Sequence, residues 1–247
     1  MARSDFSSPR LYVPDRLAFG DRVALTPEQG NYLLNVLRLR EGARVLVFNG
    51  RDGEFAGSLA PLGRKGAALR IEAQLRPQEH PWDIDYLFAP LKHARLDYVA
   101  QKAVEMGVRR ICPVMTRRTQ VSRVNVERLR ANAREAAEQC GVIWLAEVAE
   151  ERSLAKALAD WPPGRVLVFC DEDAPQVDDV AAFASRAAPA AVSLLIGPEG
   201  GFDEEERALI LRLPDVVRLS LGPRILRADT AAVAALALIQ AHWGDWR

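Results

Sequence analysis

Short apolar runs alternate with amphipathic segments through the C-terminal part of the chain, from Asp83 onward. The apolar runs predict strands at residues 83–91, 111–115, 165–172, 192–197 and 216–222. The amphipathic segments predict helices at residues 94–106, 125–140, 178–187, 203–213 and 229–243. Strands that alternate with helices form a parallel sheet covered on both faces. We therefore expect residues 83–247 to form an α/β domain.

The N-terminal residues 1–75 follow a different pattern, in which β-prone runs are separated by Gly, Pro and Asp. The runs lie at residues 10–14, 22–26, 43–50, 54–60 and 67–75. Short strands at this spacing predict a small β-barrel. Residues 76–82 are polar and contain two prolines, so we expect them to link the two domains.

One helical pattern interrupts the predicted barrel at residues 26–39. Thr26 can cap this helix, and Pro27 suits its first position. An apolar stripe follows, formed by Leu33, Leu34 and Leu37.

Composition excludes several classes of protein. Apolar residues make up 49% of the chain and charged residues 27%, which is enough to build a core. The N-terminus has no apolar segment typical of a secretory signal, and no apolar run approaches the roughly 20 residues of a membrane helix. Three cysteines without C-x-x-C spacing indicate reduced thiols. We expect a cytoplasmic protein without membrane contact.

Charge is distributed unevenly although the net charge is zero. Residues 92–134 contain eleven Lys and Arg against three Asp and Glu, whereas residues 135–217 contain six against seventeen. A basic stretch of this kind favours a polyanionic partner, but an ordinary solvated surface fits equally well.

The stretch SLLIGPEGGFDEEE, residues 193–206, predicts a buried strand, a glycine-rich loop and a helix start. Ligands of α/β proteins bind at such loops, outside the carboxyl ends of strands. The loop matches neither G-x-x-x-x-G-K-[ST] nor G-x-G-x-x-G. Glu199 would repel a phosphate, and Asp203 with Glu206 would cap the helix. The sequence therefore favours a ligand with hydroxyl groups or positive charge.

A second glycine-containing loop follows the last predicted strand. Gly222 and Pro223 turn the chain, and Asp229 or Thr230 can cap the final helix. Arg227 lies among apolar neighbours, where a salt bridge to a nearby acid is an alternative to a role in chemistry. The final helix is apolar nearly all round, which predicts a core helix or a subunit interface. The three histidines are isolated in sequence, so we expect no metal site and no His-based triad.

The two loops LIGPEGG and LGPRILRADTA together resemble those of the small-subunit ribosomal RNA uridine-N3 methyltransferases, a family of the knotted SPOUT superfamily. RLYVP, NYLLNVLRLREGARVLVFNG, LKHARLDYVAQKAVEMGVRRICPVMTRRTQV and EAAEQCG extend the resemblance over nearly the whole chain. It implies a PUA-like, RNA-binding barrel and a C-terminal SPOUT domain with a deep trefoil knot. It also implies a homodimer that uses S-adenosylmethionine to methylate N3 of uridine 1498 in 16S rRNA of the 30S subunit.

The resemblance also assigns residues to roles. The cofactor would bind Ile196, Gly197, Pro198, Glu199, Gly200, Gly201, Leu219, Leu221, Gly222, Ile225, Leu226 and Ala228. Catalysis would involve Arg227, Asp229 and Glu199. RNA would contact Arg10, Arg38, Arg109, Arg117, Arg118, Arg123 and Gln139. The family commonly has Thr and Glu where this chain has Ala228 and Asp229, so the carboxylate at that position is retained on a shorter side chain.

Other functions fit the same residues. One alternative is the same chemistry on another rRNA or tRNA nucleotide. A second is an RNA-binding ribosome assembly factor whose methylation is incidental. A nucleotide-binding α/β enzyme unrelated to methylation is a third possibility, which the acidic loop and the missing phosphate-binding motifs disfavour.

Overall fold

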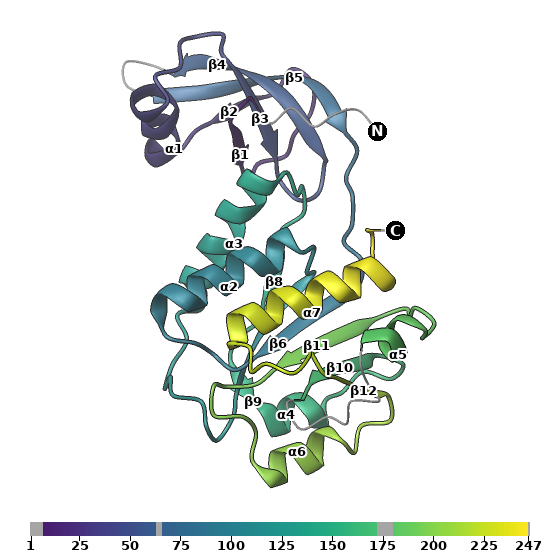
Figure 1. Ribbon diagram of the computed structural model, residues 1–247. Coiled ribbons are helices and arrows are strands. Elements are labelled where there is room, and N and C mark those ends of the chain that lie inside the picture. The colour runs from purple at the N-terminus through teal and green to yellow at the C-terminus, as the bar shows by residue number, and fades with distance from the viewer. Residues whose placement is uncertain (1–6, 63–65, 172–179, 247) are drawn as a thin grey trace. The chain divides into compact units, whose positions relative to one another are not determined.

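The computed structural model describes residues 7–62, 66–171 and 180–246 (Figure 1). It divides into two compact units. The first comprises Met1–His80 with Ala137–Leu145, and the second comprises Pro81–Ala136 with Ala146–Arg247. The predicted linker at 76–82 spans the point where the first unit passes into the second. The domain boundaries predicted from the sequence did not include residues 137–145 in the N-terminal unit.

The N-terminal unit is built on a mixed five-stranded sheet in the order β1-β3-β4-β5-β2. Its strands are β1 (Arg10–Tyr12), β2 (Arg22–Ala24), β3 (Arg44–Phe48), β4 (Glu54–Leu62) and β5 (Gly66–Arg76). β1 pairs parallel with β3, and the other pairs are antiparallel. Alternate apolar side chains of these strands form one core, which includes Val45, Val47, Leu69 and Ile71. All five predicted β-prone runs therefore form strands.

The helical interruption begins as predicted but does not continue as an α-helix. The side chain of Thr26 accepts a hydrogen bond from the backbone N–H of Gln29 in a capping box, and α1 (Pro27–Asn31) follows. The chain then forms a π-helix, η1 (Tyr32–Val36). Leu33 is fully buried, but Leu34 and Leu37 are exposed. The predicted apolar stripe was wrong at these two positions, because it assumed an α-helical period.

The C-terminal unit contains the predicted parallel sheet, in the order β12-β10-β11-β6-β7-β8, with β9 also pairing with β7. Its strands are β6 (Ile84–Phe88), β7 (Arg110–Met115), β8 (Glu147–Val148), β9 (Arg152–Ser153), β10 (Val166–Cys170), β11 (Val192–Ile196) and β12 (Val216–Leu219). All of these pairs are parallel. Every residue of β6 and β11 is buried, as expected for central strands covered on both faces.

Helices cover both faces of this sheet (Figure 1). The helices that follow β6 are α2 (His93–Glu105), α3 (Val126–Cys140), α4 (Leu154–Ala159), α5 (Val180–Ala184), α6 (Glu204–Ile210) and α7 (Ala228–His242), of which α3 has its last four residues in the first unit. α4 and α6 pack on one face in a core that includes Leu87, Leu167 and Leu195. α2 and α7 lie on the other face, where α7 contacts both β11 and α2. Within the described residues, no helix has the length and apolar character required to span a membrane.

Candidate functional site

Two loops leave neighbouring parts of the parallel sheet at the carboxyl ends of their strands. Loop A (residues 197–203) follows β11, and loop B (residues 220–227) follows β12. β10 pairs with both β11 and β12, so the two loops begin at the same edge of the sheet. At this edge the backbone N–H of Ala89, just after β6, donates to the carbonyl oxygen of Ile196 at 3.0 Å. Ligands of parallel α/β sheets bind at this position.

Loop A is tightly constrained around its glycines. A Cβ atom at Gly197 would lie 2.5 Å from Cε2 of Phe202, so only glycine fits there without displacing the ring. Gly201 has a φ of 68° and donates its N–H to the carbonyl of Pro198 at 2.9 Å, which closes a turn. Nη1 of Arg118 donates to the carbonyl oxygen of Gly200 at 2.7 Å. The loop thus presents backbone groups rather than side chains.

The acids after loop A are used within the protein. As predicted, Asp203 caps α6 and forms a capping box with Glu206. Arg117 donates through Nη1 to Oδ2 of Asp203 at 2.8 Å and also pairs with Glu205. The hydrogen bond from the backbone N–H of Glu206, assisted by Arg117, holds the pKa of Asp203 below its usual range. A phosphate would therefore meet a helix N-terminus that is already occupied by carboxylates.

Loop B leads into α7 without a side-chain cap. Gly222 has a φ of 99°, and the side chain of Ile225 is 95% exposed. α7 begins at Ala228, so Arg227 is its N-cap residue and makes no capping hydrogen bond. The prediction that Asp229 or Thr230 caps this helix was wrong, because both lie inside its first turn. Within the described parts of the chain, Arg227 is exposed and forms no ion pair, so the alternative of a salt bridge is not realised.

The carboxylates of Glu199 and Asp229 meet at one guanidinium, which belongs to Arg95 on α2. Arg95 pairs with Glu199 through Nη1, and its Nε lies 4.0 Å from Oδ2 of Asp229. Oδ1 of Asp229 accepts a hydrogen bond from the backbone N–H of Thr230 at 2.8 Å. Burial raises the pKa of the nearby Tyr86 hydroxyl, and the charge of Asp229 adds to that rise. Two of the three predicted catalytic residues are therefore brought together by an arginine that the sequence did not single out.

The predicted RNA-binding arginines differ widely in their surroundings. Arg10 is buried and pairs through Nε with Glu54 at 2.6 Å. Arg109 pairs with Asp83 at 2.7 Å and with Asp85 at 2.6 Å. Burial raises the pKa of Asp85, and neighbouring guanidinium groups oppose that rise. The charges of Arg10 and Arg109 are thus neutralised within the protein, and nothing in their surroundings supports contact with RNA.

The remaining predicted RNA-binding residues lie at the surface. Arg117 and Arg118 hold loop A and α6 as described, whereas Arg38, Arg123 and Gln139 are exposed. Arg38 has a φ of 56°, the one positive φ recorded for a non-glycine residue in the described ranges. A non-glycine residue whose backbone lies in the left-handed region is strained, and such strain is common at functional positions.

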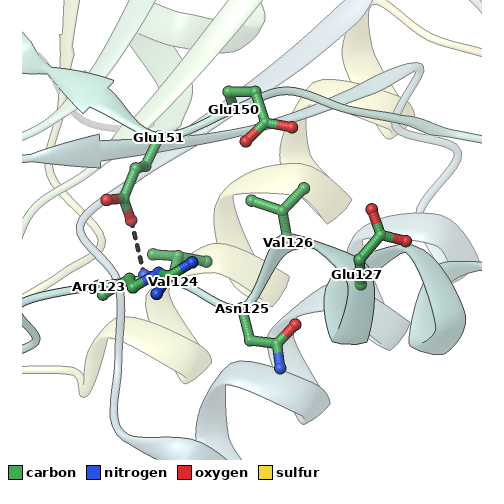
Figure 2. A pocket seen from close by; sticks show the side chains of 7 residues that line it. All are labelled: Arg123, Val124, Asn125, Val126, Glu127, Glu150 and Glu151. Carbon is green, nitrogen blue, oxygen red and sulfur yellow. Dashed lines mark hydrogen bonds between the residues drawn. The ribbon is translucent and has the colours of Figure 1, made fainter.

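A surface cavity of about 680 Å³ lies apart from the two loops, at the N-terminal end of α3 (Figure 2). It is lined by Arg123, Val124, Asn125, Val126, Glu127, Glu150 and Glu151. Oε2 of Glu151 accepts a hydrogen bond from the backbone N–H of Val124 at 2.6 Å. Three carboxylates around one arginine make this cavity a poor site for RNA. Among the described residues, no cluster of His, Cys, Asp and Glu is suited to hold a metal ion.

The chain thus combines a parallel α/β unit, with two glycine-containing loops at the carboxyl edge of its sheet, and a separate β-rich unit. The sequence model of a family described as an RNA methyltransferase domain matches residues 78–240, and that of an RNA methyltransferase PUA domain matches residues 25–72. The chain belongs to the family of ribosomal RNA small subunit methyltransferase E, as its relatives indicate.

Three of these relatives span nearly the whole chain. Ribosomal RNA small subunit methyltransferase E of Synechocystis is 30% identical over 94% of this chain and 77% of its own length. The enzyme of the same name from Neisseria gonorrhoeae, solved with S-adenosylmethionine, is 28% identical and covers 97% of this chain and 100% of its own, with a TM-score of 0.87. A methyltransferase from Legionella pneumophila, also solved with S-adenosylmethionine, is 30% identical and covers 95% and 97%, with a TM-score of 0.84.

Proposed function

We propose that this chain transfers a methyl group from S-adenosylmethionine to N3 of a uridine in 16S rRNA, at uridine 1498. The observation that carries the proposal is the pairing of loop A with loop B at the carboxyl edge of the parallel sheet. Both loops lie within residues 78–240, which match the RNA methyltransferase family. Two relatives of similar fold were solved with S-adenosylmethionine.

The residues of the two loops fit this cofactor. Gly197 lets the ring of Phe202 pack against loop A and fix its course, and backbone groups of the loop are suited to hydrogen-bond an adenine or a ribose. Two carboxylates beside a single guanidinium give a local excess of negative charge, which favours a sulfonium cation and disfavours a phosphate. When bound, the cofactor would supply an electrophilic methyl group. We propose that loop A, loop B and the strand and helix ends beside them hold it through the twelve residues assigned from the sequence.

The side chains at this edge have distinct proposed roles. Arg227 is exposed and free of ion pairs with the described residues, so its guanidinium can stabilise the uridine anion that forms as N3 loses its proton. Asp229 is not consumed as a helix cap, which leaves its carboxylate as a candidate acceptor for that proton. Glu199 is in direct contact with Arg95, whereas Oδ2 of Asp229 lies 4.0 Å from the guanidinium, so we assign Glu199 to cofactor binding rather than to proton transfer.

The target base must be accessible on its pairing edge. N3 lies on the Watson–Crick edge of uridine, so the nucleotide must be unpaired or flipped out of a helix. We propose that the PUA unit and exposed basic residues such as Arg38 bind the surrounding RNA backbone. We further propose that the enzyme is a cytoplasmic homodimer whose knotted domain completes the site, and these properties remain predictions.

A methyl-transfer assay tests the proposal directly. Purified protein is incubated with labelled S-adenosylmethionine and small ribosomal subunits that lack the modification. The modified nucleotide is then mapped by stops of reverse transcription, since a methyl group on N3 blocks base pairing. A single stop at uridine 1498 is the expected result. A stop at another nucleotide would support RNA methylation but change the target nucleotide. If the protein bound the cofactor but transferred no methyl group, rRNA of the isolated subunit would be refuted as the substrate.

A further inference from the structure

Arg95 is the one described side chain that pairs with acidic groups from both sides of the candidate site. Glu199 belongs to loop A, Asp229 belongs to the first turn of α7, and Arg95 itself lies on α2. Three segments that are far apart in the sequence thus meet at one guanidinium. Its position depends on packing between α2 and α7, which contact each other along the face of the sheet.

The charges of the three groups explain why an arginine is needed there. Two neighbouring carboxylates repel each other, and a positive charge between them removes that repulsion. The guanidinium has several donors in a rigid planar fork, so it can address two carboxylates at once. A lysine carries the same charge at a single point and is less able to fix two partners.

The first turn of α7 has no side-chain cap. Arg227, at the N-cap position, makes no side-chain capping hydrogen bond. Loop A has a second anchor, since Arg118 donates to the carbonyl of Gly200 at 2.7 Å. The ion pair of Arg95 with Asp229, with Nε 4.0 Å from Oδ2, therefore links the start of α7 to the guanidinium that also holds loop A.

We propose that Arg95 is a positioning residue: its guanidinium holds Glu199 and Asp229 together, and thereby fixes the separation of the two loops that receive the cofactor. This inference rests on the proposed function for its catalytic consequence, but its structural part does not. Loss of the guanidinium should loosen loop A and the start of α7 together. Cofactor affinity should fall as a result, whereas RNA affinity should not.

Hydrogen exchange of the free protein tests the structural part without any assay of activity. Arg95→Gln should speed amide exchange about fivefold in peptides covering loop A and the first turn of α7, as expected for the loss of a partly exposed ion pair. Arg95→Lys should restore a large share of the protection. The matched control is Arg130→Gln, because Arg130 also joins two carboxylates, those of Glu127 and Glu150, and is similarly exposed.

Titration calorimetry tests the functional part. We expect Arg95→Gln to weaken binding of S-adenosylmethionine about fivefold, with RNA affinity within twofold of wild type, and Glu199→Gln to add little in that background. Arg130→Gln should change neither affinity. Amide exchange that is unchanged in Arg95→Gln would overturn the inference. It would also be overturned if the reductions in S-adenosylmethionine affinity caused by Arg95→Gln and Glu199→Gln multiplied in the double variant. Wild-type protein that binds no cofactor, with the exchange result intact, would instead refute the proposed function and leave the loop coupling standing.

Discussion

The ring of Phe202 closes against the backbone of Gly197, so that any Cβ at residue 197 would fall 2.5 Å from Cε2 of the ring. The ring itself cannot move aside freely, because it packs edge-on against Phe169 with centroids 5.3 Å apart. Phe169 is buried on β10, the strand between β11 and β12. Loop A is thereby fixed to the core of the sheet at the point where it begins.

We expect Gly197→Ala to reduce both stability and cofactor binding. The added methyl group must displace a ring that is held in the core, which costs about 1–3 kcal/mol for overpacking of this kind. The displaced loop should then bind S-adenosylmethionine more weakly. Urea unfolding and calorimetry measure the two effects. Gly200→Ala is the stability control, because a Cβ at Gly200 would make only an ordinary 3.6 Å contact with Arg118.

Arg227→Ala should separate chemistry from folding and cofactor binding. The side chain caps nothing and pairs with no acid among the described residues, so its removal should leave the unfolding free energy within about 0.5 kcal/mol. If the guanidinium stabilises the uridine anion, the rate of methyl transfer should fall about 100-fold. Single-turnover assays with saturating cofactor measure this rate. A variant as fast as wild type would exclude the role.

Periodicity of apolar residues was sufficient to predict most of the fold. The main strands of the parallel sheet and the capped start of α1 were correct because their signals are local. β8, β9 and α4 were not predicted, since two-residue strands and a six-residue helix carry too little pattern. Leu34 and Leu37 were predicted to form one apolar stripe with Leu33, but they are exposed whereas Leu33 is buried. The N–H of Leu37 bonds to the carbonyl of Tyr32, a π-helical repeat that turns side chains away from an α-helical stripe.

The site was only partly predictable for a different reason. Both glycine-containing loops follow strands and could be located in the sequence. Arg95 could not, because its partners lie 104 and 134 positions away and are brought to it by the tertiary structure. The same limit applies to Arg10, which was expected at an RNA surface. Its partner Glu54 is 44 residues away and buries the charge.

Arg10→Ala should therefore lower stability, whereas Arg38→Ala should weaken RNA binding. Arg10 and Glu54 are both almost fully buried, so removing Arg10 leaves a buried carboxylate with Arg76 as its remaining ion-pair partner among the described residues. We expect a loss of about 2–3 kcal/mol of unfolding free energy. Arg38 is exposed, so Arg38→Ala should preserve stability and weaken RNA binding.

The salt dependence of RNA affinity checks this distinction. If Arg38 contacts a phosphate, its removal should lower the slope of log K against log salt by about one. Folded Arg10→Ala protein should retain the wild-type slope. A slope that is unchanged in Arg38→Ala, or reduced in Arg10→Ala, would reverse the assignment of the two arginines.

Cys112 should make stability sensitive to alkaline pH. Burial on β7 raises the pKa of its thiol to about 12, well above its value of roughly 8.5 in an unfolded chain. Between these values the unfolded state loses a proton that the native state retains, so the free energy of unfolding falls as pH rises, by up to about 1.4 kcal/mol per pH unit. Below about pH 8 both states are protonated and the contribution is constant.

Cys112→Ala should cost stability at neutral pH by opening a small cavity, but its stability should decline less steeply above pH 9. Urea unfolding at several pH values measures both slopes, and parallel curves for the variant and the wild type would show that the thiol does not contribute.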